Sequence, residues 1–188
     1  MGKPTFRTIL VIGDNHRDIV KKYSADTEGN EENAHYRYER CQQHRLEVTG
    51  EEGDFSDPFP LKDGWKSYST HYNMIDWERL HNNPEKIEQY RRAWEMVVDG
   101  DEPQNENEKL YKERMINHTD YFRNFDNIDK FLKHSTSFWH WGIATEDSYE
   151  DASDKDAYEW TTNFFDRFIK PLEKENPLIT IYEVKTLG

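Results

Sequence analysis

Residues 5–16 read TFRTILVIGDNH, and they indicate how the chain folds. Its first part is a continuous β-rich run between Pro4 and Gly13, apolar from Ile9 to Ile12, which predicts a buried strand. Residues 178–184 read LITIYEV and predict a second strand near the other end of the chain. The sequence between the two strands is acidic and poor in aliphatic residues. We therefore expect the fold to be built by joining the two ends.

The segments next to these strands predict helices. Asp14 or Asn15 can cap a helix that follows the first strand and carries Ile19 and Val20 on its apolar face. A second amphipathic helix is expected over residues 158–172, where aromatic residues recur on one side. Each predicted end of the chain thus pairs one strand with one helix.

The middle of the chain predicts a mostly helical insertion at about residues 25–133. Its clearest helix begins at Pro84, which suits a first helical turn, and ends at Gly100. After the insertion, residues 135–145 alternate well enough for a strand. This strand has aromatic residues on both faces, and we expect Trp139 and Trp141 to pack in the core.

The order of these elements predicts the fold class. Strand, helix, helical insertion, strand, helix and strand make an α+β domain, with helices on one face of a small sheet. A ferredoxin-like arrangement is its simplest version. We expect a single domain over residues 1–188, with the insertion between an N-terminal βα unit and a C-terminal βαβ unit.

The composition limits the classes of partner. There are 25 basic and 38 acidic residues, and the net charge of −13 repels nucleic-acid backbones and anionic membranes. Cys41 is the only cysteine, so neither an intramolecular disulfide nor a multi-thiolate metal site is expected. The N-terminus lacks a signal-like apolar region, and no apolar run is long enough for a membrane span. An intracellular protein is the expectation.

Several short motifs resemble an uncharacterised family of tailed-bacteriophage proteins. The resemblance lies in the Gly13-Asp14-Asn15 turn after the first strand, in residues 137–139 (SFW), and in residues 163–169 (NFFDRFI) followed by residues 180–183 (TIYE). It covers both ends and parts of the second half, and leaves out most of residues 25–80. It implies a phage origin and expression inside an infected host cell, in the cytoplasm, and it implies no particular reaction.

A metal site is one alternative for the residues after the first strand. Asp-x-His at a strand end resembles calcineurin-like metallophosphoesterases, and so do a Gly-Asp-x-x-Asp fragment at residues 53–57 and an Asn-His fragment at residues 117–118. Together with one further histidine they would bind divalent metal and activate water against a phosphate ester. The second fragment follows no apolar strand, and the third lies in a helical stretch. The candidate ligands are Asp14, His16, Asp54, His118 and His140. The competing interpretation is a helix cap followed by a solvated His16.

Three acidic loops suggest a different function, at residues 47–64, 99–107 and 146–156. Such loops usually keep a protein soluble. In a phage protein, fixed carboxylates can also imitate the phosphates of DNA and occupy a basic groove on a host nuclease, polymerase or regulator. The residues expected to supply this negative field are Glu51, Glu52, Asp54, Asp101, Glu102, Glu150, Asp151 and Asp154.

We therefore predict a non-enzymatic phage accessory protein without a cofactor. It would bind a host or phage protein that has a basic surface. The alternatives are a metal-dependent phosphoesterase or nuclease that uses Asp14 and His16, and a minor structural protein of the virion. The sequence does not indicate an oligomeric state.

Overall fold

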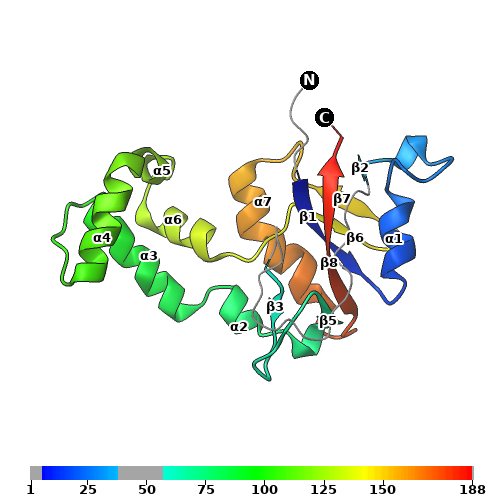
Figure 1. Ribbon diagram of the computed structural model, residues 1–188, viewed down its shortest axis with the longest axis horizontal. Coiled ribbons are helices and arrows are strands. Elements are labelled where there is room, and N and C mark those ends of the chain that lie inside the picture. Colours follow the sequence, from blue (N-terminus) through cyan, green and yellow to red (C-terminus); the bar gives the residue numbers. More distant parts are fainter. Residues whose placement is uncertain (1–5, 38–56, 188) are drawn as a thin grey trace. The chain divides into compact units, whose positions relative to one another are not determined.

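The computed structural model describes residues 6–37 and 57–187. The chain divides into two compact units, shown in Figure 1. The sheet unit comprises Met1–Trp77 and Trp139–Gly188, and the helical unit comprises Glu78–Phe138. The helical unit lies largely within the range predicted for an insertion.

The two ends of the chain form the centre of the main sheet, as predicted. β1 (Phe6–Ile12) pairs antiparallel with β8 (Leu178–Thr186), from Phe6 opposite Lys185 to Ile12 opposite Ile179. Ile9, Leu10 and Val11 are fully buried, because both faces of the strand are covered. This two-sided burial explains why the run is continuously apolar rather than alternating.

Shorter strands extend the sheet on both sides. The order is β2-β8-β1-β6-β7; β6 runs parallel to β1, and β7 runs antiparallel to β6. A further strand, β5, also pairs with β8, and β3 and β4 form a separate small sheet. The bounds of the short strands are β2 Tyr36–Arg37, β3 Phe59–Pro60, β4 Lys66–Ser67, β5 Ser69–His71, β6 Gly142–Ala144 and β7 Tyr149–Asp151.

Helices cover the two faces of the main sheet. Ile19 and Val20 of α1 (His16–Lys22) pack in one core cluster with Ile9 and Tyr182. α7 (Ala157–Phe164) lies on the other side of the sheet and continues as a π-helical turn and a 3₁₀ turn to Leu172. The α+β class is confirmed, but the helices are divided between the two faces rather than gathered on one (Figure 1).

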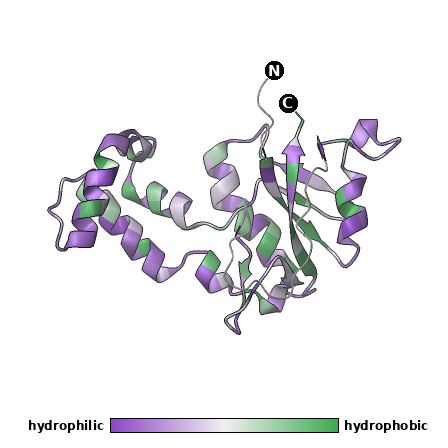
Figure 2. Ribbon diagram, in the orientation of Figure 1, coloured by the Kyte–Doolittle hydropathy of each residue, from purple (hydrophilic) through white to green (hydrophobic). Residues whose placement is uncertain are grey.

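The helical unit has its own aromatic core. Phe131 is almost fully buried, and its ring lies 5.0 Å from that of Phe122 and 5.3 Å from that of Trp94, between centroids. Figure 2 shows many hydrophilic residues along the helices of this unit, and apolar residues along β1 and β8 of the sheet unit. The helices are α2 (Trp77–Leu80, beginning in the sheet unit), α3 (Pro84–Val97), α4 (Glu106–Met115), α5 (Thr119–Arg123) and α6 (Ile128–Thr136).

The strand predicted over residues 135–145 is wrong for most of its length. α6 continues to Thr136, because its last turn is partly buried and hydrogen-bonded. Leu132 and Thr136 are both buried, and the Thr136 hydroxyl donates a hydrogen bond to the Leu132 carbonyl. Only Gly142–Ala144 forms a strand, where it pairs with β1. Trp139 therefore lies outside the sheet and is 43% exposed, so its predicted core role is wrong. Trp141 is partly buried against the α1-side cluster.

Among the helices of the described residues, none has an apolar stretch of the length that a bilayer crossing requires.

Candidate functional site

The third acidic loop is a structured hairpin. β7 pairs with β6 from Tyr149 opposite Ala144 to Asp151 opposite Gly142, and the Ser148 carbonyl accepts a hydrogen bond from the Thr145 amide at 2.8 Å. After β7, the Ala152 amide donates to the Trp141 carbonyl at 2.9 Å. We call residues 142–156 the acidic hairpin. The sequence predicted a loop here, because two of the three residues of β7 are acidic.

The predicted acidic residues of this hairpin have different environments. The Glu150 carboxylate accepts a hydrogen bond from the Arg167 guanidinium at 2.7 Å, so its charge is partly compensated. Asp151 accepts hydrogen bonds from the amide and the hydroxyl of Ser153, which fix the turn after β7. Asp154 is exposed and has no ion pair among the described residues.

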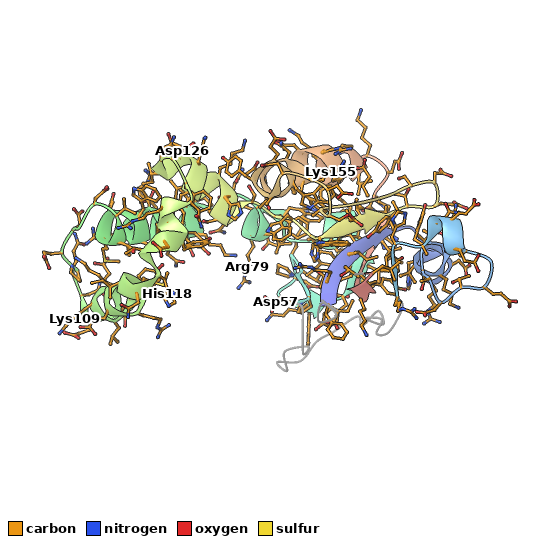
Figure 3. All side chains as sticks on the ribbon, turned by 90° about the horizontal axis from the view of Figure 1, so that it is seen from above. Asp57, Arg79, Lys109, His118, Asp126 and Lys155 are labelled. Carbon is orange, nitrogen blue, oxygen red and sulfur yellow. The ribbon has the colours of Figure 1, made fainter. Side chains whose placement is uncertain are left out.

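A hollow of about 250 Å³ lies beside the hairpin. Its lining residues combine three carboxylates with one cation and two rings: His35, Tyr149, Glu150, Asp151, Ser153, Asp154 and Lys155. Among the described residues, Lys155, labelled in Figure 3, is the only basic side chain that lines it apart from the histidine. The hollow could therefore accept a cationic group from a binding partner.

Tilted aromatic rings surround Tyr149 at the wall of the hollow. The ring of Tyr149 lies 4.3 Å from that of His35, 5.4 Å from that of Tyr23 and 5.6 Å from that of Tyr36, between centroids. Burial, and next the nearby charge of Asp151, raises the pKa of Tyr149 above its ordinary value. The Tyr149 hydroxyl is thus protonated at neutral pH, and the carboxylates supply the negative charge.

The second acidic loop is organised around one cation. Arg92 donates two hydrogen bonds of 3.1 Å to the Glu108 carboxylate, one of 3.2 Å to Asp101 and one of 2.7 Å to the Glu102 carbonyl. The bond from Arg92, and next that from the Gln104 amide, lowers the pKa of Glu108. Asp101 is therefore ion-paired, whereas the exposed Glu102 side chain has no ion pair among the described residues.

Three of the predicted acidic residues, Glu51, Glu52 and Asp54, lie outside the described residues, as does Cys41. The sequence reasoning did not single out His35, Lys155, Arg92 or Arg167. The sequence does contain a signal for Arg92. This residue lies on α3 outside the apolar stripe, and an acidic loop follows the helix. The contact between Arg167 and Glu150 joins residues 17 positions apart and had no local signal.

His16 has a structural environment that the sequence analysis did not predict. It is 6% exposed rather than solvated, and its Nδ1 shares a hydrogen bond with the hydroxyl of the fully buried Tyr182. Asn15 occupies the N-cap position of α1, but its side chain makes no capping bond. Its backbone angles, φ −86° and ψ 33°, are not the extended ones from which a cap side chain reaches the first turn. The side-chain cap expected from Asp14 or Asn15 is therefore wrong.

The other candidate metal ligands are dispersed over both units. His118 belongs to the helical unit, where Figure 3 labels it, whereas His16 and His140 belong to the sheet unit. His140 Nδ1 lies 2.9 Å from the Thr8 hydroxyl, and burial lowers its pKa to about 4. Within residues 6–37 and 57–187, no three His, Cys, Asp or Glu side chains are grouped to hold a metal ion.

Comparison of the chain with protein-family models, with curated proteins and with solved structures gave no match. The resemblance to tailed-bacteriophage proteins therefore stays a prediction.

Proposed function

We propose that this protein acts by binding a basic surface of another protein through the acidic hairpin. In this proposal it is an intracellular phage accessory protein, expressed in the host cytoplasm, whose partner handles nucleic acid. The observation that best supports this proposal is that backbone hydrogen bonds hold the hairpin carboxylates in place. Imitation of a phosphate array requires fixed spacing, and a structured hairpin supplies it.

Several acidic side chains of the hairpin face solvent. Glu146, Asp147 and Asp154 are exposed, and none of them has an ion pair among the residues that the structure describes. At physiological salt, charges act over about 8 Å, so neighbouring carboxylates on one hairpin reinforce each other at a docked surface. A basic groove that normally holds DNA would meet several of them together.

The hollow beside the hairpin supports the same function. A lysine or arginine side chain entering it would meet the carboxylates of Glu150, Asp151 and Asp154 over the rings of His35 and Tyr149. Cations are attracted both to carboxylates and to the faces of aromatic rings. The hollow thus suits one anchoring side chain within a larger basic surface.

The competing explanation is protection of a sheet edge. β7 is an outer strand of the main sheet, and charged residues on edge strands prevent pairing with other chains. Lysines protect an edge as well as acids do. Replacement of the acids by lysines therefore separates the two explanations.

The test is a charge reversal of the hairpin with a matched control. Asp147→Lys with Asp154→Lys changes exposed, unpaired carboxylates, whereas reversal of Asp101 or Glu150 would also break ion pairs. The control, Glu28→Lys with Glu32→Lys, makes the same change in net charge at exposed positions of the same unit.

Proteins captured from host lysate by the unaltered chain are identified by mass spectrometry and then quantified for both variants. We expect the control to retain the captured protein, the hairpin variant to lose it by about tenfold, and duplex DNA to compete for it. Equal capture by the hairpin variant would show that its charges only solubilise the chain or protect the edge.

A further inference from the structure

β7 has one edge that no other strand of the described residues pairs with. It is the last strand in the order β2-β8-β1-β6-β7, and its only partner there is β6. The unpaired edge of a strand presents backbone N–H and C=O groups that a further strand can bond. We call this side of Tyr149–Asp151 the β7 edge.

Two backbone hydrogen bonds set the pattern of the hairpin on either side of β7. The Thr145 amide donates to the Ser148 carbonyl at 2.8 Å, and the Ala152 amide donates to the Trp141 carbonyl at 2.9 Å. Both contacts follow the register of the ladder between β6 and β7. Bonded pairs alternate with non-bonded pairs in an antiparallel ladder. Of the three residues of β7 that lie between the two contacts, only the middle one is therefore bonded to β6.

This alternation identifies the backbone groups at the β7 edge. The middle residue, Glu150, lies opposite Ile143 in the bonded position. Tyr149 and Asp151 occupy the non-bonded positions, so their amides and carbonyls point away from β6 and toward the β7 edge. Within residues 6–37 and 57–187, no backbone hydrogen bond outside the ladder uses these four groups. They are available to a strand from another molecule.

The hollow beside the hairpin opens along the same edge. Successive side chains of a strand point to opposite faces of its sheet, so those of Tyr149 and Asp151 share one face and that of Glu150 lies on the other. All three residues nevertheless line the hollow. A space that residues of both faces border lies at the edge between the faces, which is where an added strand would run.

The charges around the β7 edge determine which kind of strand it accepts. Asp147 and Asp154 are exposed before and after β7, and Asp151 belongs to the strand itself. Opposite charges on facing residues stabilise a pair of strands, and like charges destabilise it. A second copy of this chain would bring the same acids together. A lysine or arginine facing Asp151 would instead form a favourable pair.

We propose that the β7 edge binds an extended, basic segment of the partner protein as an additional strand of the sheet. Backbone hydrogen bonds to Tyr149 and Asp151 hold the segment, and its lysine or arginine side chains provide the specificity. This inference rests on the proposed function of the acidic hairpin and adds the conformation of the segment that the hairpin binds.

The experiment is an NMR titration of the isotope-labelled whole protein with a short, capped peptide in which lysine and valine alternate. We expect the peptide to bind and to slow hydrogen exchange at the amides of Tyr149 and Asp151. The amide of Glu150 should change little, because it is already bonded to β6. Docking through side chains alone would not produce this alternation along β7.

Two N-methylated forms of the same peptide separate backbone pairing from attraction between charges. One form is methylated on its lysine amides and the other on its valine amides, so both keep the charge of the parent peptide. Only one of these two sets of amides faces β7 in an added strand. Methylation of that set should weaken binding by about tenfold, and methylation of the other set should leave it unchanged.

Two variants of the protein provide the matching comparison. Asp151→Pro and Asp151→Ala both remove the carboxylate and its hydrogen bonds with Ser153, and only proline also removes the amide at the β7 edge. An edge strand accepts proline where the N–H faces solvent, so the fold should persist, and the NMR spectrum verifies it. Asp151→Pro should bind the lysine peptide about fivefold more weakly than Asp151→Ala.

Three outcomes would overturn the proposal. The first is no binding of the lysine peptide up to about 1 mM, and the second is equal affinity of the two methylated peptides. The third is exchange at Tyr149 and Asp151 that slows with protein concentration alone, which would assign the β7 edge to a second copy of the chain. If the methylated peptides bind equally while Asp147→Lys with Asp154→Lys abolishes capture, the proposed function stands without an added strand. Retained capture by that variant would refute the proposed function itself.

Discussion

The hydrogen bond between His16 and Tyr182 joins α1 to β8, and its removal is a sharp test of how the two ends close the fold. Tyr182→Phe removes only the hydroxyl, from a side chain that is fully buried beside a histidine that is 6% exposed. Loss of one partner of a buried hydrogen bond costs about 1–3 kcal/mol. For a chain of this size, that lowers the melting temperature by about 2–4 °C per kcal/mol.

The assay is a double-mutant cycle measured by urea unfolding at pH 7, with hydrogen exchange to localise the change. Tyr182→Phe, His16→Ala and the double variant should give a coupling free energy of about 1 kcal/mol, with faster exchange in β1 and β8. Tyr121→Phe is the control, because Tyr121 is 45% exposed. A Tyr182→Phe variant as stable as the control would refute the proposed role of this bond.

Three further changes test other parts of the structure. Phe131→Ala should destabilise the helical unit by about 3–5 kcal/mol, seen as faster hydrogen exchange within Glu78–Phe138; a loss spread evenly over both units would contradict it. The pKa of His140 is about 4 in the folded chain and about 6.5 in the unfolded chain. Between pH 6.5 and 4 the unfolded chain therefore takes up a proton that the folded chain does not, and the free energy of unfolding should fall by about 1–3 kcal/mol. This loss of stability is smaller than the full pKa shift of His140 would give, because the residue keeps some solvent contact. Urea unfolding of His140→Gln should lack this dependence of stability on pH. Arg92→Gln should accelerate hydrogen exchange in the second acidic loop. Arg91→Gln should not, because within the described residues Arg91 pairs only with an exposed glutamate one turn away.

The two long strands could be predicted from the sequence because each is buried on both faces. A continuous apolar run such as residues 9–12 has few other stable environments in a small domain. α3 was predictable for a local reason. Asn83 caps it through the amides of Glu85 and Lys86, and Pro84 begins it.

β7 could not be predicted, because pairing between strands depends on residues far away. Two of its three residues are acidic, which locally favours a loop, yet its backbone completes the hairpin with β6. The contact between Arg167 and Glu150 depends in turn on that hairpin. The candidate site therefore emerged from long-range pairing rather than from a motif.

His16 did have a local signal. With Ile19, Val20 and Tyr23 it follows the spacing of one helix face, so the pattern places it on the buried side of α1. The resemblance to a metal motif suggested that the ring nitrogens of His16 bind a metal ion, whereas the helical spacing indicated that its side chain packs in the core. Burial beside Tyr182 agrees with the spacing.

In our proposal the acidic hairpin is the surface that meets a basic partner. Hydrogen-exchange mass spectrometry of the unaltered chain, free and bound to its captured partner, can locate that surface. We predict slower exchange on binding at residues 142–156 and at His35, with little change in the helical unit. Protection confined to Glu78–Phe138, with the hairpin unchanged, would show that the hairpin is not the binding surface.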